Sequence, residues 1–118
     1  MKANVTDITL HQQSKVLEVS FDTDETFELS CEFLRVFSPS AEVRGHGPGQ
    51  EVLQLGKEDV NIESIEPVGS YGIKPMFSDG HNTGIFSWDT LYEYGRERDS
   101  MWQQYLKDVA AAGHKRKG

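Results

Sequence analysis

Hydrophobic and polar residues alternate along much of the first thirty positions of the chain. Residues 7–11, 16–21 and 26–30 follow a period of two, which is the pattern of strands with one buried face. Polar, turn-forming residues separate these stretches at 12–15 and 22–25. Strands with such short links pair with their neighbours in sequence, so the pattern predicts an antiparallel three-stranded meander.

A short helix is predicted directly after the third strand. Ser30 is a favoured N-cap residue. Phe33, Leu34 and Phe37 then share one face at helical spacing. Proline disfavours helical backbone at the residue before it, so we expect the helix to end ahead of Pro39.

The next segment, residues 38–50, contains three glycines and two prolines and predicts a long surface loop. Long loops in compact domains carry function more often than average. We therefore consider this loop a candidate surface for a protein partner. The residues at its centre are Arg44, Gly45, His46 and Gly47.

Extended structure is predicted again at residues 61–68, 71–77 and 85–87. Pro67 fits an edge strand or the end of a strand, because proline cannot donate to a sheet. Residues 78–84 are a run of turn-forming residues, which indicates a hairpin loop before the last strand.

The last third of the chain has helical periodicity. One short helix is predicted around residues 88–95, and Ser100 with Gln103 matches a capping box that opens a second. Gly113 is a natural stop for that helix. The pattern predicts an α+β fold: a small, mainly antiparallel β-sheet domain with a short helix after the third strand and C-terminal helices.

The length of 118 residues suits one domain with a modest core, which we place at residues 1–112. Residues 113–118 form a basic tail that we expect to be disordered. The formal net charge is −7, and the tail carries three of the twelve basic residues. The rest of the chain therefore has a formal net charge near −10 (−7 − 3). An acidic body repels phosphate backbones, and we expect no nucleic-acid binding by the folded domain.

The composition also bears on the compartment. No apolar run approaches the length of a membrane span, and the first residues lack the apolar core of a secretory signal. The single cysteine, Cys31, excludes an internal disulfide and a Cys-x-x-Cys knuckle. These features predict a cytoplasmic protein that does not bind membranes.

The sequence offers little for catalysis. None of the four histidines belongs to the His-x-Asp or His-x-Glu pair of an iron oxygenase. Cys31 lies at a helix start, where it is either a small core residue or a thiol activated by the helix dipole. Residues 45–49 are rich in glycine but do not match a phosphate-binding loop. Trp102 and Tyr105 share a helix face, as core residues or as a partner-binding stripe.

Two segments together carry a resemblance to a known family. Residues 34–47 (LRVFSPSAEVRGHG) resemble a Leu-Arg-x-x-Cys-x-Cys-x-x-Cys signature, and residues 77–91 (FSDGHNTGIFSWDTL) resemble Phe-x-Asp-Gly-His followed by Gly-Ile-x-x-Trp-x-x-Leu. These are the signatures of the γ-butyrobetaine hydroxylase-like N-terminal domain, also called DUF971. The resemblance extends over roughly residues 5–98.

In the hydroxylases the domain precedes the oxygenase barrel and resembles a structural zinc module with three cysteines and one histidine. Position by position, the resemblance places these ligands at Ser38, Ser40, Val43 and His81, of which only His81 keeps its residue type. We therefore expect no native zinc or iron, although His46 is close enough in sequence to join His81 in an adventitious site. We expect His81 to form hydrogen bonds within its own turn.

The resemblance also bears on function. Free-standing relatives exist in bacteria, and related domains are fused to iron–sulfur cluster carrier ATPases. Our leading hypothesis is a non-catalytic accessory domain that binds a protein partner, such as iron–sulfur or oxygenase machinery, through the 38–50 loop and the adjacent sheet. The alternatives are a metal-binding or iron–sulfur-associated factor and an enzyme of unrecognised type.

Overall fold

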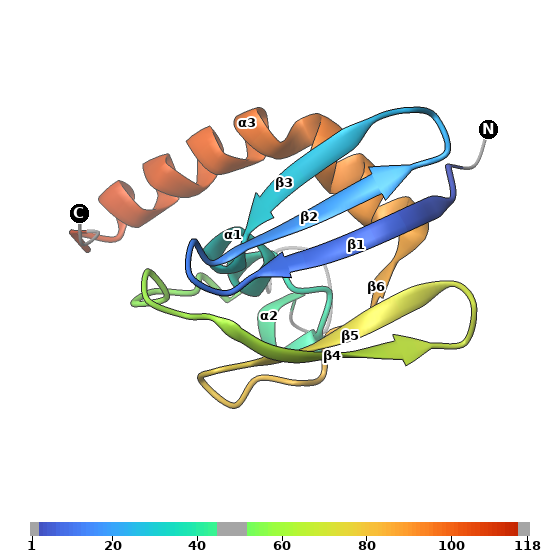
Figure 1. Ribbon diagram of the computed structural model, residues 1–118. Helices are drawn as coiled ribbons and strands as arrows, with labels where there is room; N and C mark the ends of the chain where they lie inside the picture. Colours follow the sequence, from blue (N-terminus) through green and yellow to red (C-terminus); the bar gives the residue numbers. More distant parts are fainter. Residues whose placement is uncertain (1–2, 45–51, 116–118) are drawn as a thin grey trace.

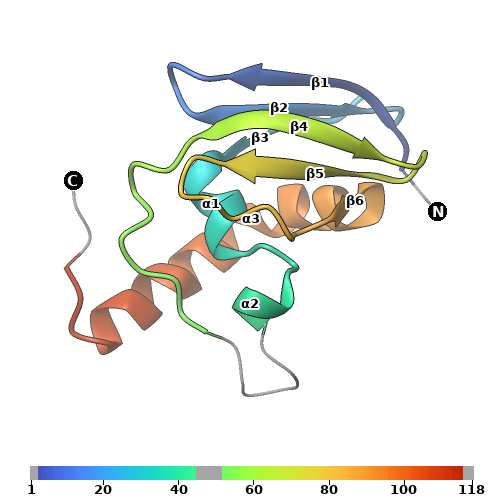
Figure 2. The same cartoon turned by 90° about the horizontal axis from the view of Figure 1, so that it is seen from below.

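The computed structural model describes residues 3–44 and 52–115, and its fold is α+β, as predicted (Figure 1). The strands are β1 (Val5–His11), β2 (Val16–Phe21), β3 (Thr26–Ser30), β4 (Ile62–Val68), β5 (Gly72–Phe77) and β6 (Phe86–Ser87). The helices are α1 (Cys31–Val36), α2 (Ala41–Arg44) and α3 (Trp88–Ala111). Both sheets lie on one side of the domain, with α1 and α3 on the other (Figure 2).

The first sheet is the predicted antiparallel meander, in the order β1-β2-β3. Its central strand buries alternate side chains, Leu17, Val19 and Phe21. Because successive side chains of a strand point to opposite faces, this one strand contributes three residues to the core. The predicted bounds of β2 and β3 agree with the structure.

The second sheet is also antiparallel, in the order β4-β5-β6. Pro67 lies on β4, an edge strand, as its missing amide hydrogen requires. β6 pairs only with the first two residues of β5, Gly72 and Ile73. Pro75 lies further along β5 than these two residues, so its missing amide hydrogen does not interrupt the pairing with β6.

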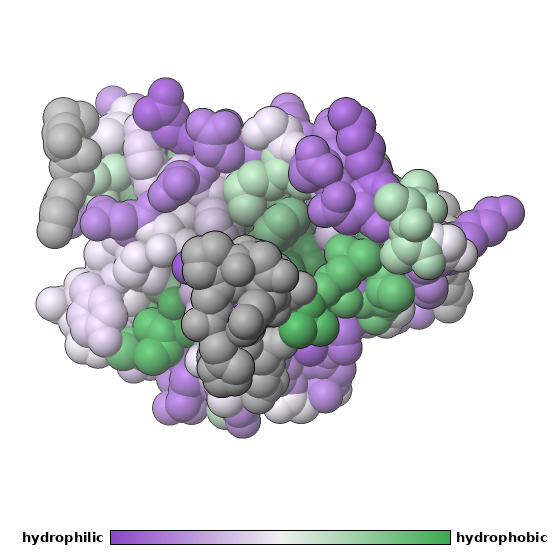
Figure 3. Space-filling model, turned by 180° about the vertical axis from the view of Figure 1, so that it is seen from behind, coloured by the Kyte–Doolittle hydropathy of each residue, from purple (hydrophilic) through white to green (hydrophobic). Residues whose placement is uncertain are grey.

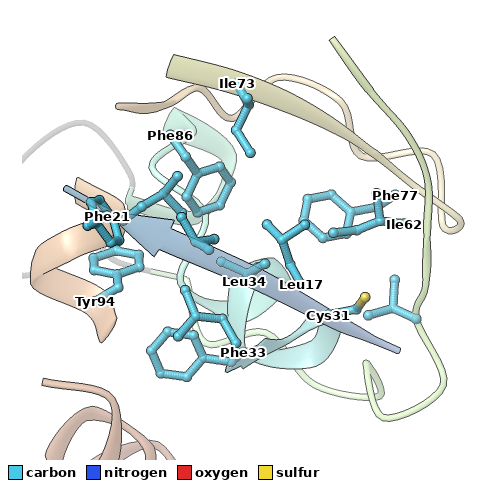
Figure 4. Close-up of a cluster of buried hydrophobic side chains, with 14 of the residues drawn as sticks. Leu17, Phe21, Cys31, Phe33, Leu34, Ile62, Ile73, Phe77, Phe86 and Tyr94 are labelled. Carbon is cyan, nitrogen blue, oxygen red and sulfur yellow. The ribbon is translucent and has the colours of Figure 1, made fainter. Parts of the chain in front are cut away.

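Helix α1 connects the two sheets through the core. The Ser30 hydroxyl accepts a hydrogen bond from the Phe33 amide at 3.0 Å, which confirms the predicted N-cap. All six residues of α1 are buried. Figure 4 shows Phe33 and Leu34 in one cluster with side chains from both sheets, so the two sheets and α1 share one hydrophobic core.

Helix α3 corrects the prediction of two C-terminal helices, because it runs unbroken for 24 residues. Ser87 is its N-cap and accepts from the Thr90 amide, whereas Ser100 lies inside the helix and donates to the Glu97 carbonyl at 3.1 Å. Gly95 does not interrupt the helix either. A Cβ there would overlap the ring of Phe27, so glycine allows α3 to pack closely against β3.

The end of α3 is a Schellman motif. Gly113 has a φ of 75°, and its amide donates to Ala110 while the His114 amide donates to Val109. The predicted stop at Gly113 is confirmed. Of the predicted tail, residues 116–118 lie outside the described part of the chain. Within the described part, no helix is long and apolar enough to cross a membrane.

The start of the predicted 38–50 loop differs from the prediction. One helical turn, α2, forms at residues 41–44, and Ser38, Ser40 and Val43 are buried rather than on the surface. Burial of polar residues is tolerated here because both serine hydroxyls form hydrogen bonds. Residues 45–50 lie outside the described part of the chain.

Candidate functional site

The two signature segments meet in the structure. The chain between α1 and α2 packs against the loop between β5 and β6, and the Ser38 Oγ lies 2.9 Å from the His81 Nε2. Ser38 is fully buried and His81 is 5% exposed. Either atom can be the donor, depending on the tautomer of the ring. This hydrogen bond therefore joins the first signature to the second in the protein interior.

A second pair of hydroxyls extends the contact. The Ser40 Oγ and the Thr83 Oγ1 lie 2.6 Å apart, and the Ser40 amide donates to the Ser38 Oγ at 3.4 Å. Gly84 follows Thr83, and a Cβ at its position would overlap the Ser38 Oγ. We call Ser38, Ser40, His81 and Thr83 the hydroxyl–histidine cluster.

An ion pair lies in the same two segments. Asp79 Oδ2 contacts Arg35 Nε at 2.8 Å and Lys57 Nζ at 2.7 Å, and Asp79 Oδ1 accepts from the His81 amide at 3.1 Å. Partial burial alone would raise the pKa of Asp79, but the hydrogen bonds from Lys57, the His81 amide and Arg35 outweigh it. They lower the pKa of Asp79 from 3.8 to about 2. Asp79 is therefore ionised at neutral pH and fixes the turn that carries His81.

The chain on either side of residues 45–51 is held by hydrogen bonds. The Val52 amide donates to the Val43 carbonyl at 2.7 Å, which brings the two flanks together. Arg44 Nη2 donates to the Tyr94 hydroxyl at 3.0 Å. Further along, the Tyr105 hydroxyl donates to the carbonyl of Gln54 at 2.6 Å, so α3 anchors both flanks.

Of the four positions at which the resemblance places zinc ligands, Ser38 contacts His81 and the Ser40 amide, and the Val43 amide donates to the Ser40 carbonyl. Ser38, Ser40, Val43 and His81 are all buried, between 0% and 6% exposed. Their chemistry does not fit a structural zinc ion, because zinc in such sites takes thiolate, imidazole or carboxylate ligands. A neutral hydroxyl is a poor ligand and valine offers none. Within the described residues, no group of three or more His, Cys, Asp or Glu side chains could hold a metal ion.

His81 departs in part from the expected role. Its backbone amide does bond within its own turn, to Asp79, but its ring reaches across to Ser38. The loop residues Gly45, His46 and Gly47 lie outside the described part of the chain. The expected adventitious site of His46 with His81 therefore stays a prediction.

Cys31 is a core residue rather than an activated thiol. Its side chain is fully buried, and its Sγ lies 3.7 Å from the Asn61 Oδ1. Burial raises the pKa of the Cys31 thiol, which opposes formation of the thiolate. Tyr105 is also buried, in a small cluster with Val36 and Val109, so this part of the predicted helix stripe belongs to the core.

Three exposed hydrophobic residues follow the loop, a feature that the sequence pattern did not single out. Val52 is 53% exposed, Leu53 36% and Leu55 38%. The hydrogen bond between the Val52 amide and the Val43 carbonyl places the first of these residues beside the segment that carries Arg44. Figure 3 shows one face of the domain, on which hydrophobic surface (green) lies among hydrophilic surface (purple).

Sequence reasoning also missed the partners of the buried polar residues. Thr83 and Lys57 lie far along the chain from Ser40 and Asp79, and no local spacing links them. Arg35 belongs to the first signature and Asp79 to the second, so the two motifs together already contained both partners of this ion pair.

Comparisons with known proteins agree with this geometry. A family model described as γ-butyrobetaine hydroxylase-like, N-terminal, matches residues 8–92. One NMR solution structure is 44% identical, with a TM-score of 0.85, and the match covers 99% of this chain and 92% of the other. A second is 47% identical, with a TM-score of 0.83, and the match covers 98% and 86%.

A crystal structure also matches, that of a protein with unknown function of the DUF971 family from Acidithiobacillus ferrooxidans ATCC 23270. It is 38% identical, with a TM-score of 0.63, and the match covers 75% of this chain and 88% of the other. No curated protein matches the chain significantly.

Proposed function

The chain belongs to the γ-butyrobetaine hydroxylase-like N-terminal domain family, and we propose that it is a non-catalytic interaction domain that binds a protein partner beside the 38–50 loop. The observation that carries the proposal is the hydrogen bond between the Val52 amide and the Val43 carbonyl. It places Val52, the first of the exposed hydrophobic residues Val52, Leu53 and Leu55, beside Val43 and so next to Arg44 in the chain.

The anchors beneath this surface support an interaction role. Arg44 is held by Tyr94, and Gln54 is held by Tyr105, both through side-chain hydroxyls of α3. A surface that is ordered before binding loses less conformational entropy when a partner docks. Arginine, the residue type of Arg44, is also enriched in protein interfaces.

The proposed contact surface differs from the full 38–50 segment. Ser38, Ser40 and Val43 are buried, so they support the surface from below and cannot contact a partner directly. Among residues 38–44 and 52–55, which the structure describes, Arg44 and the exposed run that begins at Val52 are available for contact. Iron–sulfur or oxygenase machinery remains the class of partner that the family resemblance favours.

In this proposal the domain requires no metal and performs no catalysis. The hydroxyl–histidine cluster occupies the place where the family resemblance puts a zinc site, and its donor set does not suit zinc. A metal-handling role is the alternative. It predicts stoichiometric zinc, iron or an iron–sulfur cluster in protein purified without a histidine tag.

The test is affinity purification from the native cell with the wild-type chain and three variants. We expect Leu53→Ser with Leu55→Ser to lose the partner that the wild-type chain retains, and Arg44→Ala to weaken it. Tyr71→Ser is the matched control, because Tyr71 is 55% exposed on the hairpin between β4 and β5. Equal partner recovery with all forms, each folded by circular dichroism, would overturn the proposal.

A further inference from the structure

A groove of about 370 Å³ is lined by residues of α3, of β3 and of the start of α1. It is distinct from the hydroxyl–histidine cluster and shares no residue with it. Its lining is mostly apolar. The lining residues are Val16, Glu28, Ser30, Phe33, Arg98, Asp99 and Trp102.

Aromatic rings form part of the groove. The ring centroids of Phe33 and Trp102 lie 6.3 Å apart, and Trp102 stacks on Tyr105 at 5.1 Å. Phe33 is buried and Trp102 is half-buried. The indole is therefore fixed by its neighbours while part of its surface faces the groove.

The one arginine of the groove already has acceptors. Arg98 Nη1 donates to the Glu28 backbone carbonyl at 2.8 Å, and Nη2 lies 3.3 Å from the Asp99 Oδ1. Arg98 thus links α3 to β3 and is partly neutralised by Asp99. Because Arg98 bonds to the backbone of Glu28, its guanidinium does not pair with the Glu28 carboxylate.

The charge around the groove is negative. Glu28 lies opposite Glu18 across β2 and β3, and the Glu18 Oε1 contacts the His11 Nε2 at 3.0 Å, so Glu28 is the carboxylate of the two without an ion-pair partner among the described residues. The lining residues carry two acidic side chains, Glu28 and Asp99, and one basic side chain, Arg98, a net charge of −1. Within the described residues, no cation lies at ion-pair distance from the Glu28 carboxylate.

From this combination we infer that the groove binds a basic, extended segment of a partner protein and receives one arginine or lysine side chain. The cation would lie against the indole of Trp102 and pair with Glu28. A guanidinium stacks on an aromatic face and binds a carboxylate through two N–H groups, so arginine fits better than lysine.

The experiment titrates the ¹⁵N-labelled full chain with the peptide acetyl-Gly-Arg-Gly-Arg-Gly-amide and follows amide chemical shifts. We expect saturable shifts confined to residues 15–18, 28–33 and 98–102. The same peptide with citrulline in place of arginine is expected to bind at least about fivefold more weakly, because the charge is removed while the shape is kept.

Two variants of equal charge separate the groove from the overall acidity of the domain. Glu28→Gln is expected to weaken binding about three- to fivefold, and Glu66→Gln, on β4, less than twofold. Absence of saturable shifts, or equal losses in both variants, would overturn the inference. So would groove shifts in the free protein on deletion of residues 115–118, which would identify the chain's own tail as the occupant.

Discussion

Ser38 and His81, 43 residues apart in sequence, are joined by a buried hydrogen bond of 2.9 Å between Oγ and Nε2. Each residue lies at a position where the family resemblance places a metal ligand. The structure thus has a direct side-chain bond where a metal-bridged contact is expected in the hydroxylase relatives. We interpret the hydroxyl–histidine cluster as a metal-free connection between the two signatures.

The first prediction concerns the strength of this bond. Ser38→Ala removes the hydroxyl and leaves the buried His81 Nε2 without this partner, which is expected to cost about 1–3 kcal/mol in the free energy of unfolding. Urea denaturation measures the change. Ser64→Ala is the matched control, because Ser64 is exposed on β4, and its change should stay within about 0.5 kcal/mol. Equal values for both variants would show that the bond contributes little.

The second prediction uses the close approach of Gly84 to Ser38. Gly84→Ala introduces a methyl group that overlaps the Ser38 Oγ, and overpacking of this kind costs about 1–3 kcal/mol. Ser38→Ala removes the overlapping oxygen, and the remaining Cβ of residue 38 lies 3.4 Å from the added Cβ. The double variant should therefore be more stable than the sum of the two single losses predicts. Additive losses would contradict the packing described here.

The third prediction concerns the vacated ligand positions. Ser38→Cys, Ser40→Cys and Val43→Cys together place three thiols beside His81, which supplies the ligand types of a closed zinc site. We expect the triple variant to bind one equivalent of Zn²⁺ and to gain stability on binding. Adding His81→Ala should weaken the binding, and a triple variant without zinc affinity would show that the four positions do not converge.

The fourth prediction follows from the lowered pKa of Asp79. Because this pKa falls from 3.8 to about 2 on folding, the carboxylate stabilises the fold above pH ~4, and the contribution is lost as the pH falls toward 2. Asp79→Asn should cost about 1–2 kcal/mol at pH 7, allowing for solvent screening of a side chain that is 24% exposed.

The pH dependence of the same variant gives the control. The difference in unfolding free energy between wild type and Asp79→Asn should shrink between pH 4 and pH 2. Asp7→Asn, a change of an exposed carboxylate on β1, should give a small difference at each pH. A difference for Asp79→Asn that does not change with pH would mean that the ion pairs with Arg35 and Lys57 contribute nothing.

Local patterns predicted the first half of the fold well, because each strand there has a period of two and each turn is short. They failed where distant contacts decide the structure. Ser100 matches a capping box, yet α3 continues through it and packs against β3 at Gly95. A capping motif is a local preference, and burial of a helix face outweighs it.

The candidate site was predictable only in part. The signatures identified Ser38, Ser40, Val43 and His81 as one group, and the structure joins Ser38 to His81 and to the Ser40 amide. The hydrogen bond between Ser40 and Thr83 was not predictable, since hydroxyl pairs have no spacing rule. The exposed run at Val52 has no periodicity to distinguish it from a buried strand, so only the fold shows that its side chains face solvent.

The most direct test of the central claim is metal content together with unfolding free energy, measured on protein purified without a histidine tag. We predict less than about a tenth of an equivalent of zinc or iron, and the same unfolding free energy with EDTA, with added Zn²⁺ and with neither, because hydrogen bonds hold the site. One equivalent of bound metal, with a loss of stability in EDTA, would contradict the account.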